Sequence, residues 1–132
     1  MYKSFLEKFQ INGPIMKSDI VEVETQFQLK FPPDYVEFML EANGGEGTVG
    51  ERNYLRLWKI EELIQDNEEY AVHDFAPGLI LIGSDGGGTA YGYDFRNEIP
   101  KLVEVDFIGL DLDSPFYSTY KFSEFIEYLY NY

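Results

Sequence analysis

Apolar side chains recur every three or four residues in five segments of the chain, which is the spacing of an amphipathic helix. These segments are residues 2–9, 20–27, 35–42, 60–69 and 122–129. Ser18 or Asp19 can cap the second helix, and Pro33 suits the first turn of the third. Asn43 and the two glycines after it are typical of a helix end. The sequence therefore predicts three helices early in the chain, one in the middle and one at the end.

Alternating apolar and polar positions predict strands in the region between these helices. The predicted strands are residues 54–58, 79–82, 89–95 and 102–107, and residues 116–118 form either a further edge strand or a loop. Residues 79–82 are all apolar, as in a strand buried on both faces, whereas residues 102–107 place Glu104 and Asp106 toward solvent. Residues 46–53 and 73–78 are predicted to be irregular. This order predicts one α+β domain over residues 1–132, with a mostly antiparallel sheet of about four to five strands flanked by helices.

A turn of small residues, Ser84-Asp-Gly-Gly-Gly88, joins two of the predicted strands. Glycines permit backbone angles that a Cβ atom would forbid, so this segment predicts a tight hairpin turn that displays Asp85. A phosphate-binding P-loop needs a lysine directly after its last glycine, and the next lysine here is Lys101. A dinucleotide-binding turn needs glycines that open a helix, whereas these open an aromatic strand. The pattern favours a structural hairpin over a phosphate site.

Acidic side chains far outnumber basic ones, with 24 Asp and Glu against 10 Lys and Arg and a formal net charge of −14. Nucleic acid and anionic membrane surfaces are disfavoured as partners, because binding them requires a positively charged footprint. The acidity either serves solubility or steers a basic protein partner, and charge alone does not distinguish these alternatives.

The chain contains no cysteine, which excludes disulfides, thiolate metal ligands and a cysteine nucleophile. Its N-terminal segment is too polar for a signal peptide, and no apolar run reaches transmembrane length. A cytoplasmic location is therefore expected.

Residues able to carry catalysis form no recognisable pattern. His73 is the single histidine, and no Gly-x-Ser-x-Gly elbow accompanies it. Paired carboxylates, such as Asp111 with Asp113 or Asp85 with Asp94, would suit a carboxylate-based hydrolase, but so acidic a chain supplies many pairs by chance. An EF-hand calcium loop is also absent from the sequence. We expect no catalytic residue, no metal and no cofactor.

Several short motifs follow one another over residues 20–129. They are Ile20-Val-Glu-Val-Glu24, Leu29-Lys-Phe-Pro-Pro-Asp-Tyr35, Asn43-Gly-Gly45, Trp58 with Glu61-Glu-Leu63, Ile82-Gly-Ser-Asp-Gly-Gly-Gly88 and Phe122-Ser-Glu-Phe-Ile126. In this order and spacing they resemble the SUKH superfamily, the Smi/Knr-like group. The resemblance implies an α+β domain that acts by binding other proteins. Bacterial members are similar to immunity proteins, which neutralise polymorphic toxins that are often nucleases.

Resemblance and composition together lead to one main hypothesis, a non-catalytic immunity protein that binds and neutralises a basic toxin domain. The residues expected to bind this partner are Asp85, Asp94, Glu46, Glu51 and Trp58. The alternative is a regulatory scaffold domain that binds a host enzyme or a cell-wall or signalling protein. A structural role competes at each position, since Asp commonly shapes turns and Trp commonly fills cores.

Overall fold

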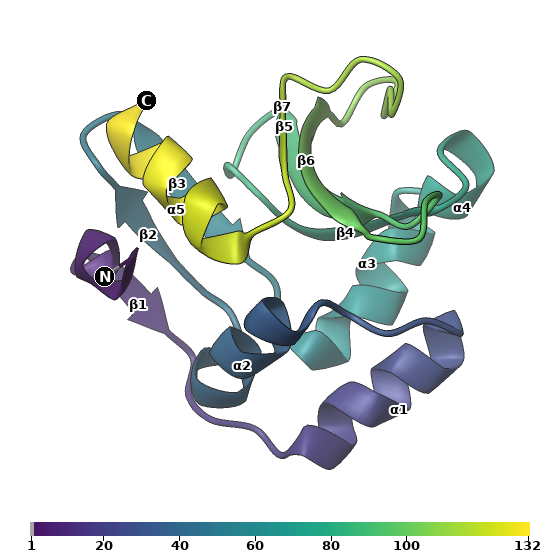
Figure 1. Cartoon of the computed structure of the whole chain (residues 1–132), viewed down its shortest axis with the longest axis horizontal. Helices are drawn as coiled ribbons and strands as arrows, with labels where there is room; N and C mark the ends of the chain where they lie inside the picture. Colours follow the sequence, from purple (N-terminus) through teal and green to yellow (C-terminus); the bar gives the residue numbers. More distant parts are fainter. Residues whose placement is uncertain (1) are drawn as a thin grey trace.

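A computed structural model describes residues 2–132 as a curved antiparallel sheet with helices packed mainly against one face (Figure 1). The α-helices are α1 (Lys17–Phe27), α2 (Pro33–Ala42), α3 (Leu63–Glu69), α4 (Val72–Phe75) and α5 (Phe122–Asn131), and the 3-10 helices are η1 (Tyr2–Leu6) and η2 (Ile60–Glu62). The strands are β1 (Phe9–Ile11), β2 (Gly45–Val49), β3 (Asn53–Leu57), β4 (Leu79–Ser84), β5 (Thr89–Asp94), β6 (Lys101–Asp106) and β7 (Tyr117–Thr119). The predicted α+β class is confirmed.

The strands of residues 2–132 form one seven-stranded sheet in the order β1 to β7, and every neighbouring pair is antiparallel. The prediction of about four to five strands was therefore too low. One missed strand, β2, lies in the segment predicted as a loop, because its sequence Gly-Glu-Gly-Thr-Val lacks the bulky residues typical of strands. Its glycines serve close pairing: a Cβ atom on Gly47 would lie 2.7 Å from the Cα atom of Phe9 on β1.

Other differences concern short elements. The first predicted helix is a 3-10 turn followed by β1, on which Phe9 pairs with Gly47 and contacts Phe38 of α2. A stripe of four apolar residues fits either one continuous helix or a short helical turn followed by a strand. Pairing with β2 stabilises the second arrangement. The segment 73–78, predicted as irregular, contains part of α4, and the open alternative near residues 116–118 is resolved as β7.

Two polar side chains join the helices to one another. Asn43 ends α2 with a φ of 47°, and its side chain accepts a hydrogen bond from the Ile60 amide and donates one to Glu61, both at 2.9 Å. Asp34 at the start of α2 accepts a hydrogen bond of 2.8 Å from the amide of Phe122, the first residue of α5. Asp34 therefore caps a helix 88 residues away in the chain.

Apolar side chains form two cores, one on each face of the sheet. The larger core lies under the helices and includes Ile20, Tyr35, Phe38, Leu55, Tyr93, Phe122 and Phe125. The smaller core joins α4 and the segment after β6 to the opposite face of β4, β5 and β6, and includes Val72, Leu79, Leu81, Ala90, Val103, Val105 and Leu110. Strands β4 to β6 are thus covered on both faces. This confirms the prediction for β4 from its apolar run, whereas β6 was predicted to have one face toward solvent.

The free edge of β4 is closed by a side chain instead of a strand. β3 pairs with β4 only at Ser84 and Gly83, so the first part of β4 has no strand partner on that side. Asn67 of α3 accepts a hydrogen bond of 2.8 Å from the Leu81 amide and donates one of 3.0 Å to the Leu81 carbonyl. One buried side chain therefore substitutes for a neighbouring strand at this point.

We expect Asn67→Ala to lower the free energy of unfolding by about 2–3 kcal/mol, because it leaves the buried amide and carbonyl of Leu81 without partners. Urea unfolding checks this against Gln65→Ala, an exposed change on the same helix that should stay within about 0.5 kcal/mol of the parent. Equal stability of the two variants would contradict this role for Asn67.

Candidate functional site

Strands β2 and β3 expose polar side chains on the sheet face opposite α2 and α5, and we call this surface the outer face (Figure 1). Its side chains are Glu46, Thr48, Tyr54 and Arg56. Glu46 lies opposite Arg56 in the strand register, with 3.7 Å between carboxylate and guanidinium, and also accepts a hydrogen bond from the Tyr54 hydroxyl. The structure thus places Glu46, predicted to lie in a loop, on an exposed strand surface.

The glycine turn lies against this outer face. Asp85 accepts hydrogen bonds from the amides of Gly87 at 2.8 Å and Thr89 at 3.1 Å, so its carboxylate shapes its own turn. Gly86 has a φ of +84°, and a Cβ atom on it would lie 3.5 Å from the Arg56 side chain. The fold therefore brings the turn that carries Asp85 beside the Glu46–Arg56 pair.

A row of three aromatic rings continues from the outer face. Trp58 follows β3 and stacks on Tyr70, with 6.0 Å between ring centroids and 6° between ring planes. Tyr70 in turn contacts Phe107 at 4.6 Å, and the Phe107 amide donates a hydrogen bond to the carbonyl of Gly88 in the glycine turn. Trp58 is half-buried and Tyr70 is 45% exposed, so this aromatic row combines packing with accessible ring surface.

Carboxylates surround a hollow of about 360 Å³ beside Trp58. Its lining includes Glu46, Trp58, Glu62 and Asp66 together with the basic residues Arg56 and Lys59. Burial first, and then the nearby charges of Glu62 and Glu69, raise the pKa of Asp66 above its usual value. The three carboxylates outnumber the two cations, so the hollow has a small excess of negative charge.

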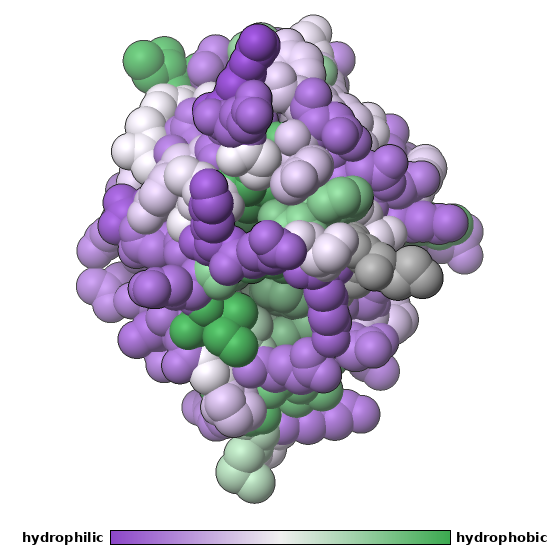
Figure 2. Space-filling view, turned by 90° about the vertical axis from the view of Figure 1, so that its left-hand side faces the viewer, coloured by the Kyte–Doolittle hydropathy of each residue, from purple (hydrophilic) through white to green (hydrophobic). Residues whose placement is uncertain are grey.

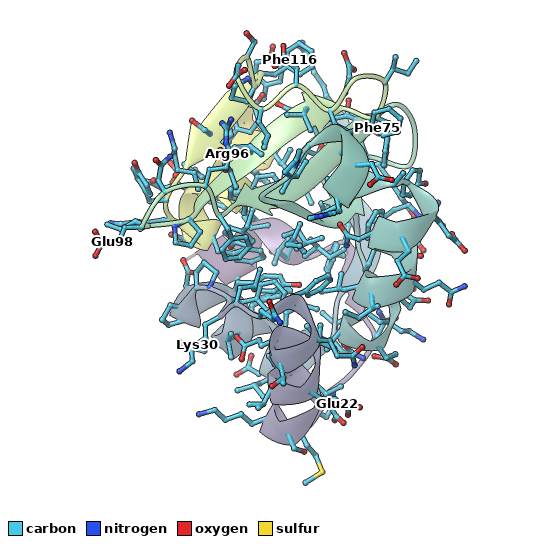
Figure 3. The ribbon with its side chains drawn as sticks, turned by 90° about the vertical axis from the view of Figure 1, so that its right-hand side faces the viewer. Glu22, Lys30, Phe75, Arg96, Glu98 and Phe116 are labelled. Carbon is cyan, nitrogen blue, oxygen red and sulfur yellow. The ribbon has the colours of Figure 1, made fainter. Side chains whose placement is uncertain are left out.

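Asp94 does not belong to this surface. It is 4% exposed, lies at the opposite end of β5 from the glycine turn, and forms an ion pair of 3.0 Å with Arg96. The same guanidinium, in the upper left part of Figure 3, reaches Asp113 at 3.1 Å and the carbonyl of Leu112 at 3.2 Å. Asp85 and Asp94, one of the carboxylate pairs considered from the sequence, lie at opposite ends of the β4–β5 hairpin and do not form a pair. Asp94 instead helps fix the segment after β6 through Arg96.

Glu51 lies apart from the other proposed binding residues. It is exposed in the turn between β2 and β3, whereas Trp58 lies at the other end of β3. Its neighbours across a shallow hollow include Lys8, Arg52 and Tyr130. The structure therefore brings together Glu46, Trp58 and the turn of Asp85, and leaves Glu51 at the margin.

Glu104 is an electrostatically unusual residue that the sequence pattern assigned to solvent. It is half-buried on β6 beneath α5 and accepts a hydrogen bond of 2.7 Å from the Tyr128 hydroxyl. Burial is the main cause that raises the pKa of Glu104, the charge of Asp85 adds to it, and the Tyr128 hydrogen bond opposes it. The alternating pattern of β6 placed Glu104 on the polar side of the strand. Its burial could not be predicted from that pattern, because the side chain that covers it, Tyr128, comes from α5.

Within residues 2–132, no three His, Asp or Glu side chains are grouped in a way that could hold a metal ion. No helix among the same residues has the length and apolar character needed to cross a bilayer.

Comparison with known proteins agrees with this architecture. Residues 14–130 match the family model described as "SMI1 / KNR4 family (SUKH-1)". A protein of Bacillus subtilis (strain 168), named "Uncharacterized protein YnaB", is 35% identical over 115 residues, which cover 82% of this chain and 75% of that protein. The chain belongs to the SMI1/KNR4 family (SUKH-1). The resemblance drawn from the sequence motifs is thereby confirmed.

Several motif residues of this SUKH-1 chain act in the fold. Asp34 caps α5, and Asn43 joins the end of α2 to η2. Trp58 differs from them, because it borders a hollow as well as packing in the aromatic row. Among these motif residues, Trp58 therefore has the geometry best suited to contact a partner.

We expect Arg96→Met to lower the free energy of unfolding by about 2–4 kcal/mol, because the carboxylate of Asp94 would stay buried without its counterion. Urea unfolding provides the measurement, with Arg52→Met in the exposed β2–β3 turn as the charge-matched control. If both variants unfold at the same urea concentration, the structural role of Asp94 is refuted.

The raised pKa of Glu104 predicts a pH-dependent gain from Glu104→Gln. Because the folded state binds this proton more tightly than the unfolded chain, stability falls as pH rises from about the usual value of 4.5 through the folded pKa. Glutamine keeps an acceptor for Tyr128 but carries no charge, so we expect a higher Tm than the parent at pH 7. The difference in Tm between variant and parent should vanish well below pH 4.5, where Glu104 is protonated in both the folded and the unfolded state. Glu127→Gln on the exposed side of α5 should neither raise the Tm at pH 7 nor change its dependence on pH.

Proposed function

We propose that this SUKH-1 protein is a non-catalytic immunity protein that binds and neutralises a basic toxin domain, for example a nuclease. Family membership supports a role in binding proteins, and the net charge of −14 supports a basic partner. The observation that carries the proposal is the half-buried Trp58, stacked in an aromatic row and bordered by the carboxylates of Glu46, Glu62 and Asp66, on the side of the sheet opposite α2 and α5.

The outer face offers both parts of a tight protein interface. Tryptophan and tyrosine are the side chains that most often dominate binding energy, because they bury a large area with little loss of conformational freedom. Trp58 and Tyr70 supply such area beside the glycine turn. Glu46, Glu62 and Asp66 supply negative charge around it. A lysine or arginine of the partner could pair with these carboxylates while its stem packs on the rings.

Long-range attraction adds to these contacts. From the side on which β1 and the N-terminus lie in Figure 1, hydrophilic side chains cover most of the surface (Figure 2). A strongly acidic protein raises the association rate with a basic partner, and salt lowers that rate. An immunity protein benefits from fast capture, because the toxin must be bound before it reaches its target.

The proposal assigns no catalytic step to this chain. His73 lies exposed on α4, and no hydrogen bond joins it to a serine hydroxyl in the part of the chain that the structure describes. The carboxylates beside Trp58 line a small hollow together with the basic side chains of Arg56 and Lys59.

The decisive experiment is neutralisation. Proteins captured by the immobilised chain at low salt and released by moderate salt are identified, and each basic domain is expressed in a host with and without this chain. Restored growth only in the presence of the chain supports immunity. Capture of a cell-wall or signalling protein, with no toxic domain to neutralise, supports the scaffold alternative instead.

A substitution on the outer face tests where the toxin binds. Thr48→Arg adds a cation to the exposed side of β2 without removing a core contact, and should weaken affinity for the basic domain about tenfold or more through like-charge repulsion. Ser118→Arg on the exposed side of β7 makes the same charge change with four strands between it and β2, and should have little effect. Affinity measured by calorimetry compares them, and equal losses would move the interface elsewhere.

A further inference from the structure

A groove runs between α1 and the segment formed by η2, α3 and α4, on the side of α3 away from Trp58. One part has a volume of about 800 Å³ between α1, η2 and α3, and a second of about 580 Å³ continues toward α4 and the start of β4. Both parts share Gln26, Ile64 and Glu68, so they form one continuous depression. In Figure 3 this side of the molecule faces the viewer, with α1 below the sheet and Glu22 projecting from it.

The floor of the groove is apolar. It is formed by Ile15, Val23, Phe27, Leu29, Ile60, Ile64, Val72, Leu79, Ile80 and Phe95. Ile15, Phe27, Leu29, Ile64, Ile80 and Phe95 are only half-buried and pack against the larger core. The larger core therefore reaches the surface along this groove, where apolar area remains to be covered.

The walls of the groove are acidic. Asp19 and Glu22 stand on α1, Glu61 and Glu68 stand opposite on η2 and α3, and Asp74 lies on α4. None of these five carboxylates forms an ion pair with a described residue, and no lysine or arginine among residues 2–132 lines either part. The lining also includes the histidine His73.

The neighbouring groove between α1 and α2 provides a contrast. Its volume is larger, about 960 Å³, but Lys17 and Lys30 stand among its acidic residues Glu24 and Glu37. The two grooves are alike in having an apolar lining. They differ in charge, because the groove beside α3 has acidic residues but no lysine or arginine of residues 2–132 around its apolar floor, whereas the groove between α1 and α2 has both acidic and basic ones.

We propose that the groove between α1 and α3 binds a basic amphipathic helix of a protein partner. Two helices form its sides, which is the setting in which a third helix lays its apolar stripe between them. The eleven residues of α1 give it a length of roughly 16 Å, enough for about three turns of a bound helix. Lysines and arginines flanking the apolar stripe would face the carboxylates of both walls.

This site is distinct from the outer face and does not depend on the proposed immunity function. η2 and α3 separate the two surfaces, since Glu62 and Asp66 border the Trp58 hollow whereas Glu61 and Gln65 border the groove. The helix could belong to the toxin or to another protein, and its chemistry is the same in either case.

Nuclear magnetic resonance titration with a synthetic peptide tests the proposal. The probe is a capped peptide of about 14 residues, with leucines at i, i+3, i+4 and i+7 and lysine or arginine elsewhere. A scrambled peptide of the same composition carries the same charge without the apolar stripe. We expect the amphipathic peptide to shift amide signals of α1, α3 and α4, to gain helicity, and to bind more tightly than the scrambled peptide.

Matched charge variants separate the groove from general attraction. Glu22→Gln with Glu68→Gln removes one exposed carboxylate from each wall, and should weaken peptide binding about three- to tenfold. Glu98→Gln with Glu127→Gln makes the same change in net charge at exposed positions elsewhere and should leave binding nearly unchanged.

Several outcomes would overturn the groove proposal: no binding of the amphipathic peptide, equal binding of both peptides, signal shifts confined to other elements, or equal losses in both double variants. Thr48→Arg should not affect peptide binding, so failure of this site and failure of the outer-face interface are distinguishable.

Discussion

Burial of β4, β5 and β6 on both faces is the constraint from which the rest of the structure follows. Helices cover one face of these strands, and α4 with the segment after β6 covers the other. Little of the chain remains to cover anything else. The outer face of β2 and β3 is therefore open, and α1 packs beside η2 and α3 with a groove left between them. The outer face and the groove beside α3 therefore both lie outside the region in which the central strands are covered on two sides.

The few basic residues are used partly within the fold, and this shapes the surface charge. Arg96 neutralises the buried Asp94 and also pairs with Asp113, while Arg56 pairs with Glu46 on the outer face. With 10 basic and 24 acidic side chains, most carboxylates have no cation within the chain. They remain at the surface, where water solvates them and a basic partner can pair with them.

The candidate site was only partly accessible from the sequence. Trp58 and the glycine turn stood out by residue type, and the structure brings them together through Tyr70 and Phe107. Asp94 looked equivalent to Asp85 along the sequence, yet one is buried in an ion pair and the other shapes a half-exposed turn. Residue type alone does not distinguish these roles, because burial depends on what the rest of the chain packs against each position.

The sequence by itself determined the elements whose periodicity is strong and local: α1, α2 and α5, the apolar β4 and the glycine hairpin. It also determined the strongly acidic character of the chain. Tertiary structure decided the glycine-rich β2, the closing of the β4 edge by Asn67, and the burial of Glu104 under Tyr128. Each of these depends on contacts between segments far apart in the chain. The spacing of apolar residues within a segment predicts the helix or strand that the segment forms. It does not predict which distant segment packs against it.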